Sequence, residues 1–353
     1  MAVNDKDYAL VIGLNDYPTY GAGGRSLKGA IHDAEEFANW LRNDEDGGAL
    51  PDSHVKLITS TADPLAPSQQ DIDGALEEIK AQSSVTGARR LYFYFSGHGH
   101  VSGELRHDVA LCLPHWSRDR RNAALSSSKY LDYLLKCTDF PEIIMLLDCC
   151  RVKQVAAIGK PSDLDCPLAA GGGRRVMIAY ASEFLKPAFE AAAARGGGDG
   201  AEPDTSVDEV RGHFTEALLA GLRGGAAKPN GGVTARELKR YLEDNVSRVA
   251  QRHSHEQVPQ VPLDMSDQDA DALVFGSAQP LLEANLEIRF AAGRTGVIEL
   301  IGPTGDVLKS GEASTGPWRL RLEKGLYLLV DTAAYQQQPL RFMPGAEVLY
   351  VDF

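Results

Sequence analysis

Two short stretches of this sequence carry side chains that could together form and use a thiolate. The stretch "YFSGHGH" places His98 between two glycines. About 50 residues later, "LLDCCR" contains two adjacent cysteines, Cys149 and Cys150. A cysteine becomes a strong nucleophile when a neighbouring histidine or another electropositive group favours its thiolate. The two stretches therefore predict covalent catalysis by a cysteine and histidine pair.

The adjacent cysteines cannot both take this role. Neighbouring residues on a strand point to opposite faces, so at most one of Cys149 and Cys150 faces a given cleft. The other is expected to pack in the core, and the alternation alone leaves the assignment open.

The elements that must position these residues alternate along the chain. Helices are expected at 27–43, 68–82, 127–138, 213–223 and 233–251, and apolar runs predict strands at 8–14, 55–59, 90–97, 143–149, 175–181 and 272–276. This alternation is typical of a mostly parallel sheet covered by helices, an α/β fold. Both reactive stretches end a predicted strand, and ligands of such sheets bind beyond the carboxyl ends of the strands.

The chain is expected to divide into two domains. Residues 1–280 hold the α/β pattern, whereas residues 281–353 read as short alternating strands separated by turns, which predicts a small all-β, sandwich-like domain. This second domain contains neither His nor Cys, so an accessory or regulatory role is expected for it. Two stretches in the first domain, 151–175 and 191–211, are rich in Gly, Ala and Pro and are expected to be mobile loops.

Composition excludes several classes of function. The formal net charge of −13 argues against binding nucleic acid. Neither a membrane-spanning apolar run nor the features of a signal peptide are present, so a cytoplasmic protein without membrane contact is expected. The five cysteines lack paired spacing, which predicts free thiols and no structural zinc site. No metal and no organic cofactor are assigned.

The motifs "YFSGHG" and "LLDCCR" resemble the catalytic pair of caspase-fold cysteine peptidases, most closely the metacaspase and prokaryotic caspase-like group. In caspases the histidine also lies about 50 residues before the cysteine. The stretches "YALVIGLNDY", "LKGAIHDA", "IAYASE" and "GHFTEALLAGL" extend the resemblance over residues 5 to 277. It implies a caspase-like three-layer α/β/α domain.

The resemblance also implies roles for individual residues. It makes Cys150 the nucleophile and His98 the proton donor to the leaving amine, with the backbone N–H groups of Gly99 and Cys150 holding the oxyanion. Asp33, Asp148 and Ser96 match the pocket for the substrate side chain before the cut. Two carboxylates suit arginine, ahead of lysine, because a guanidinium can be bound bidentately.

Aspartate specificity is disfavoured, since Leu27 stands where animal caspases carry an arginine. The expected partners are protein or peptide substrates with Arg or Lys before the cut. Calcium activation, known in some relatives, stays an open alternative because only Glu104 and Asp108 follow the histidine motif as acids.

The resemblance further implies control and a biological setting. Prokaryotic relatives often act as effectors in antiviral defence or cell death, switched on by an upstream factor. Our hypothesis is a zymogen that is cut in one of the two loops, by itself or by an activating protease. The basic residues that could be cut are Arg151, Lys153, Lys160, Arg174, Arg175, Arg195 and Arg211.

Two other classes of function remain open. One is a catalytically silent caspase-like binding or assembly module, against which the retention of both His98 and Cys150 speaks. The other is an esterase or amidase on a doubly wound sheet, for which the sequence offers no Gly-x-Ser-x-Gly elbow.

Overall fold

The chain forms two compact units, Met1–Pro280 and Leu281–Phe353. The computed structural model describes residues 4–20, 25–43, 47–102, 108–164, 173–192, 210–228, 231–277, 286–291, 294–303, 305–315, 317–320, 322, 325–342 and 349–353. Among these residues no helix is both long and apolar enough to cross a membrane.

A six-stranded sheet with the order β15-β11-β9-β5-β1-β2 forms the centre of the first unit. Its five parallel strands lie within one residue of their predicted positions and are β1 (Asp7–Gly13), β2 (Val55–Thr59), β5 (Arg90–Ser96), β9 (Glu142–Asp148) and β11 (Arg175–Tyr180). The edge strand β15 (Leu263–Asp264) pairs antiparallel to β11.

The predicted strand at 272–276 is placed differently. Part of it is β16 (Val274–Ser277), which follows the short helix α6 (Asp267–Ala272) and pairs antiparallel with β14 (Gly232–Thr234), outside the central sheet. A short apolar run indicates burial but not the strand with which it pairs.

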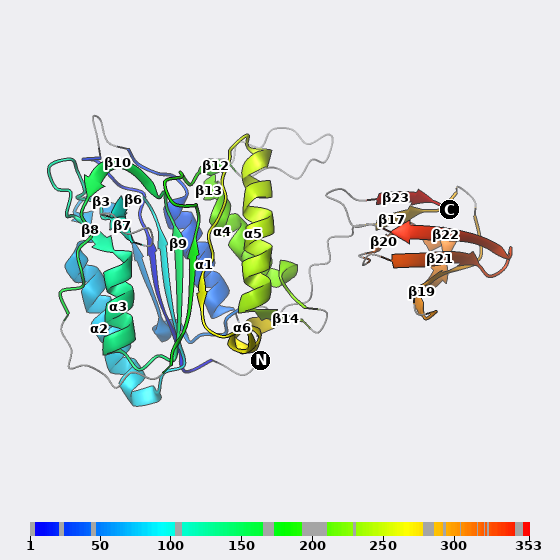
Figure 1. The fold of residues 1–353 in the computed structure, drawn as a ribbon, viewed down its shortest axis with the longest axis horizontal. Coiled ribbons are helices and arrows are strands. Elements are labelled where there is room, and N and C mark those ends of the chain that lie inside the picture. Colours follow the sequence, from blue (N-terminus) through cyan, green and yellow to red (C-terminus); the bar gives the residue numbers. More distant parts are fainter. Residues whose placement is uncertain are drawn as a thin grey trace. The chain divides into compact units, whose positions relative to one another are not determined.

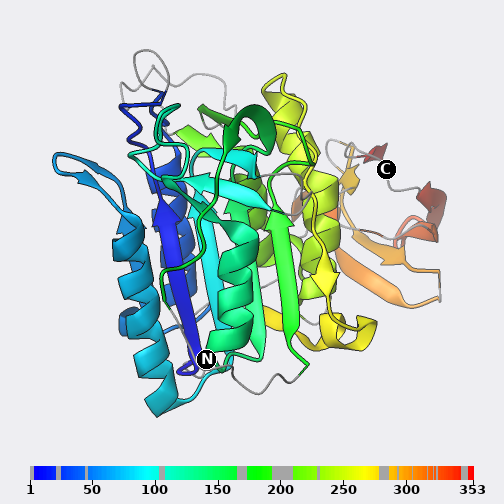
Figure 2. The same cartoon turned by 60° about the vertical axis from the view of Figure 1, so that its left-hand side comes forward.

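Helices cover both faces of the central sheet, which gives the predicted three layers (Figure 1). The side chains of Tyr8, Leu10 and Ile12 pack with α2 (Gln69–Thr86) and α3 (Ser127–Cys137). The alternate residues Ala9 and Val11 pack on the other face with the helices α1 (Ala30–Arg42), α4 (His213–Ala220) and α5 (Ala235–Arg252). Figure 2 brings the layer of α2 and α3 in front of the strands.

A smaller four-stranded sheet, in the order β10-β6-β7-β8, follows the central strands at their carboxyl ends. Its strands are β6 (Gly99–Ser102), β7 (Val109–Cys112), β8 (Ala124–Ser126) and β10 (Val152–Ala157). The prediction of a loop over 151–175 is therefore wrong at its start, where β10 runs parallel to β6. Its pairing depends on backbone groups of β6, which a search for large apolar side chains does not detect.

The second predicted loop, 191–211, begins and ends in a two-stranded ladder. The strands β12 (Glu190–Ala192) and β13 (Val210–Gly212) pair antiparallel, and residues 193–209 between them lie outside the described residues. Residues 165–172 of the first predicted loop lie outside them as well.

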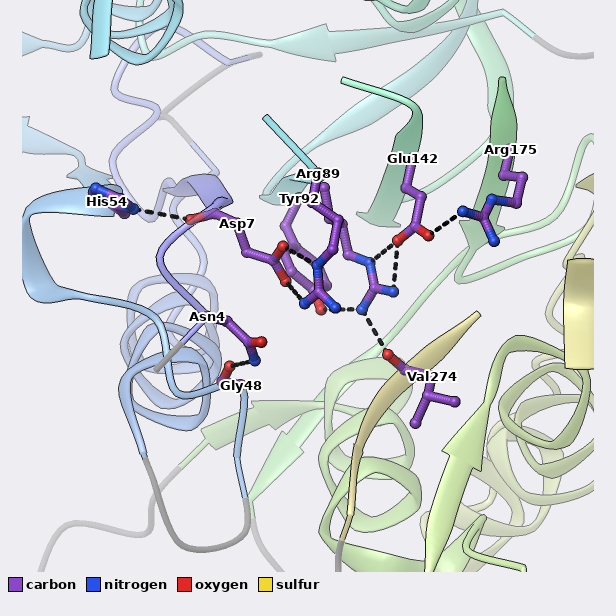
Figure 3. Close-up of polar contacts among 10 residues, drawn as sticks. Asn4, Asp7, Gly48, His54, Arg89, Tyr92, Glu142, Arg175 and Val274 are labelled. Carbon is purple, nitrogen blue, oxygen red and sulfur yellow. Dashed lines mark hydrogen bonds and ion pairs between the residues drawn. The ribbon is translucent and has the colours of Figure 1, made fainter. Parts of the chain in front are cut away.

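Buried ion pairs join the amino ends of the central strands (Figure 3). Arg90 bonds to Glu142 with a shortest N–O distance of 2.6 Å, and Arg175 bonds to the same carboxylate at 2.8 Å. Arg89 forms two hydrogen bonds to Asp7, from its Nε to Oδ1 and from its Nη2 to Oδ2. Every carboxylate in this group faces a guanidinium.

The second unit is all-β, as expected. One sheet contains β20 (Trp318–Leu320), β17 (Leu286–Arg289) and β23 (Leu349–Asp352), and the other contains β19 (Val307–Glu312), β18 (Val297–Ile301), β21 (Gly325–Asp331) and β22 (Gln336–Phe342). Residues of both sheets share one apolar core that includes Leu286, Ile298, Trp318 and Leu329.

Candidate active site

Two neighbouring strands bring the candidate catalytic residues together. In the pairing of β5 with β9, Ser96 lies opposite Asp148, and His98 and Cys150 each follow two residues later. Both side chains line one cavity of about 410 Å³. The carboxyl ends of these strands thus bring the two reactive stretches to the same cleft.

The two cysteines have different surroundings. Cys149 is 3% exposed and packs in the core formed with α2 and α3, as the alternation predicts for one of the pair. Cys150 is partly exposed and lines the cavity. Its Sγ donates to the carbonyl of Ala188 at 3.3 Å and accepts from the Ala188 N–H at 3.2 Å. Burial raises the pKa of the Cys150 thiol.

His98 lies under an aromatic cover. Its ring stacks on Tyr20 with 4.2 Å between ring centroids, and its backbone N–H donates to the Tyr17 hydroxyl at 3.0 Å. Its Nε2 bonds to the carbonyl of Arg25 at 2.6 Å. Because a carbonyl only accepts, Nε2 carries the proton and Nδ1 keeps the lone pair. Burial lowers the pKa of His98 to about 4, so the imidazole is neutral at neutral pH.

Two glycines permit this close approach. A Cβ on Gly99 would lie 2.6 Å from the Cys150 carbonyl oxygen and 2.7 Å from the Cys149 Sγ. A Cβ on Gly97 would lie 2.5 Å from the Tyr17 hydroxyl. The motif around His98 therefore needs glycine on both sides because the backbone touches the cysteine turn and the aromatic cover.

Two buried acids lie deeper in the same cavity. Asp33 from α1 is 2% exposed and accepts from the Gly212 N–H at 2.8 Å. Asp148 is 6% exposed and accepts from the Thr215 hydroxyl at 2.7 Å and from its N–H at 3.2 Å. Burial, with Asp148 as neighbour, raises the pKa of Asp33 well above its usual value, and burial raises the pKa of Asp148 to about 6.

Glu190 is a third acid at the cavity that sequence reasoning missed. It begins β12, and its carboxylate accepts from the backbone N–H groups of Lys28 at 3.0 Å and Gly29 at 2.8 Å, at the amino end of α1. It lies about 160 residues from those partners and inside a stretch without periodicity, so no local signal marks it. Tyr17 and Tyr20 were also missed, although they follow β1 at the same edge of the sheet, where ligands bind.

Several residues proposed as cut sites have folded roles. Arg151 is 2% exposed, donates to Gln260 Oε1 at 2.6 Å and lies 4.0 Å from the ring centroid of Tyr180. Arg174 donates to three backbone carbonyls between α3 and β9, and Arg175 belongs to β11. A protease needs an extended segment that can leave the surface, so these three positions are poor cut sites.

The other proposed cut sites differ among themselves. Lys153 is exposed on β10, Lys160 is half-buried, and Arg211 lies in β13. Arg195 lies outside the described residues.

Neither Asp108 nor Cys137 lines the catalytic cavity, whereas the Cys112 N–H donates to the His98 carbonyl at 2.9 Å. Asp108 is buried and accepts from the Ser126 hydroxyl at 2.8 Å and the Ser128 N–H at 3.1 Å, at the start of α3, while Glu104 lies outside the described residues. Cys137, expected as a free thiol, is disulfide-bonded, so that expectation is wrong for this residue. Widely spaced cysteines give no local sign of pairing.

Three comparisons with known proteins give matches. The caspase domain family matches residues 6–270. The chain is 29% identical over 332 residues to a probable protease from a Desulfuromonadales bacterium, in a match that covers 86% of this chain. The chain spans only 38% of the length of that relative. The crystal structure of caspase-1 from Spodoptera frugiperda aligns with 78% of this chain and 98% of its own, at 14% identity and a TM-score of 0.45.

Proposed function

This chain belongs to the caspase domain family. We propose that it is a cysteine-type peptidase that cuts peptide bonds after arginine, and less readily after lysine, with Cys150 and His98. The Cys150 thiol gives its proton to His98 as its sulfur bonds to the carbonyl carbon, and the amide C–N bond then breaks as His98 passes that proton to the leaving amine. Water then hydrolyses the thioester and restores the thiol. The N–H groups of Gly99 and Cys150 stabilise the oxyanion in this proposal.

One observation carries the proposed specificity. Asp33 and Asp148 lie buried in the cavity wall, and the hydrogen bonds that they receive within the described part of the chain come from N–H groups and a hydroxyl. An unpaired buried carboxylate is expensive, which is why burial raises both pKa values. A guanidinium entering the cavity would supply the missing countercharge. Glu190 adds a third negative charge to the same wall.

Among the residues that the structure describes, Arg25 is the one arginine that lines this cavity, and it contacts His98 of the catalytic pair. Burial sets the direction of both pKa shifts, and the charge of Arg25 partly offsets the rise at Cys150 and adds to the fall at His98. The Arg25 carbonyl accepts from His98. Arginine before the cut is therefore favoured over aspartate, because the acids rather than Arg25 form the deep wall.

The observed contacts fit a resting state. Both catalytic groups are neutral, and the hydrogen bonds of the Cys150 Sγ are to the backbone of Ala188. We propose that activation releases Cys150 from Ala188 and turns the thiol toward His98. A cut in a surface segment, by this chain or by an upstream protease, is the proposed trigger. Lys153 lies in the paired strand β10, so Arg195, which lies outside the described residues, is the candidate that remains.

We also keep the broader setting as a proposal. A protease of this specificity in the cytoplasm would need such restraint, and an effector role in prokaryotic defence or cell death would use it. Calcium is not needed by any step derived above.

A cleavage profile on a mixed peptide library tests the proposed function. The purified full chain is assayed before and after limited proteolysis, with Cys150→Ala as the blank. Cleavage after Arg, then Lys, is expected. Cleavage mainly after Asp would overturn the specificity, and a chain without thiol-dependent activity in either form would favour the binding-module alternative.

A further inference from the structure

A second cluster of reactive side chains lies beside the cleft, between α4 and the end of α5. His213 and Glu216 come from the first turn of α4, and His253 follows the last residue of α5. One potential ligand atom from each of the three lies within 4.8 Å of the other two. His213 is buried, whereas Glu216 and His253 are half-buried, so the cluster is reachable from solvent.

A third histidine, His255, orients this group. His255 Nδ1 and His213 Nε2 are hydrogen-bonded at 2.9 Å. The other ring nitrogen of His213 is then the one that can bind a metal. A metal-binding histidine usually holds a hydrogen bond through its second nitrogen, which fixes the tautomer and the ring plane. His253 stacks on the same ring with 5.0 Å between centroids.

The donor set indicates the class of metal. Two imidazoles and one carboxylate suit Zn²⁺, and three protein ligands leave a fourth position for water. Zinc bonds of about 2.0–2.2 Å place tetrahedral ligand atoms roughly 3.4 Å apart, so separations of up to 4.8 Å must shorten by at most about 1.4 Å. The half-buried Glu216 and His253 can make this movement. The contact of Glu216 with Arg252, at 3.9 Å, is long and exposed, so it offers little resistance.

We propose that His213, Glu216 and His253 bind Zn²⁺, with His255 as the residue that positions His213. No residue of this set is part of the catalytic pair or the acid pair. The site goes beyond the proposed function and departs from the sequence-based assignment of no metal. The histidines escaped notice because the packing of α4 on α5 joins positions 40 residues apart.

The cluster is also linked to the cleft by direct contacts. His255 lines the catalytic cavity and stacks on Phe189 with 4.3 Å between ring centroids. The carbonyl of Phe189 accepts from the His213 N–H at 3.1 Å, and the preceding residue, Ala188, holds Cys150. Zinc that fixes His213 and His255 would therefore stabilise the segment that keeps Cys150 at rest. This consequence, unlike binding itself, rests on the proposed function.

Metal binding is measured on the full chain with Cys150→Ala, which removes the thiol as an alternative zinc ligand. Zinc is titrated against a chromophoric chelator, and Co²⁺ is added separately to record its visible absorption. We expect one tight equivalent and the intense bands of four-coordinate cobalt. His253→Gln and Glu216→Gln should each weaken zinc binding at least tenfold, whereas the matched change His115→Gln, at a histidine outside the cluster, should not.

Thermal unfolding without metal shows that each variant is folded, and His213 is left intact because it is buried. Equal zinc affinity in the parent, His253→Gln and Glu216→Gln proteins would overturn the site, and so would a parent that does not bind zinc. In the chain with an intact Cys150, zinc should inhibit peptide cleavage at lower concentration than in His253→Gln. Equal inhibition of the intact chain and His253→Gln would show that zinc at this cluster does not act on the cleft. The zinc affinities would still show whether the cluster binds the metal. An inactive chain would count against the proposed function alone.

Discussion

The two ends of the central sheet both bury acids, but they neutralise them in different ways. At the amino ends of the strands, Asp7 and Glu142 face the guanidinium groups of Arg89, Arg90 and Arg175 (Figure 3). At the carboxyl ends, Asp33 and Asp148 accept hydrogen bonds from neutral groups in the wall of a cavity. The first arrangement is complete without a ligand. In the second, no lysine or arginine among the described residues is hydrogen-bonded to either acid, and the charge of Arg211 only partly offsets the burial of Asp33.

This difference separates stability from function within one sheet. A buried carboxylate that already holds an arginine contributes to folding only while both partners stay. A buried carboxylate without a paired arginine has a raised pKa and opposes folding at neutral pH. Such a group is common at functional sites, where a bound ligand can stabilise the charge. Changes at the amino ends should therefore affect stability, and changes at the carboxyl ends should affect catalysis and specificity.

The largest effect is expected from the catalytic pair at the carboxyl ends. Cys150→Ala and His98→Ala should each lower kcat/KM for peptide cleavage by about 10⁴-fold or more, as loss of a nucleophile or its base does elsewhere. The unfolding midpoint should stay near that of the parent. Cys149→Ala is the matched control and should keep substantial activity, although it loses core packing. A Cys149 variant without activity, beside an active Cys150 variant, would reverse the assignment.

The next effect concerns the amino ends. Glu142→Gln should lower the free energy of unfolding by about 3–5 kcal/mol, because Arg90 is left buried without its counterion. Denaturant titration measures it, and the exposed pair of Asp132 and Lys136 provides the control, since Asp132→Asn should change stability by less than about 1 kcal/mol. The Arg preference of the folded Glu142→Gln protein should be unchanged. A shift in that preference would contradict the idea that the amino ends affect stability alone.

A smaller effect of opposite sign is expected for the acid pair. The pKa values of Asp33 and Asp148 are raised in the folded state, so the carboxyls favour folding when protonated and this contribution is lost as pH rises through those values, about 6 for Asp148. Asp33→Asn should therefore stabilise the chain relative to the parent, by an amount that grows as pH rises from about 4 toward the raised pKa of Asp33, and should give no gain below about pH 4.

Denaturant titrations at several pH values measure this gain, with the exposed Asp119→Asn as the control. A loss of stability in Asp33→Asn at neutral pH would show that the pair is compensated in a way that the contacts above do not include.

Much of the architecture could be predicted because local sequence patterns, such as apolar runs, indicate the main strands. The five parallel strands have apolar runs, so their positions could be predicted within one residue. The strand β10 was missed because its sequence is partly polar and its pairing depends on the backbone of β6.

The site divides in the same way. His98 and Cys150 follow strands that pair directly, so their meeting could be expected from the order of the strands. Glu190 and the group of His213, Glu216 and His253 could not, because helix packing and a distant ladder bring them into place. Local periodicity carries no information about such contacts.

The central claim is that Asp33 and Asp148 form the pocket for a cationic side chain before the cut. It is tested most directly by comparing kcat/KM for two peptides that differ only in arginine or its neutral isostere citrulline at that position. The parent should prefer arginine by about 10²-fold or more, and Asp33→Asn should lose most of this preference while its rate on citrulline changes little. Equal rates on both peptides in the parent, or an unchanged ratio in Asp33→Asn, would contradict the account.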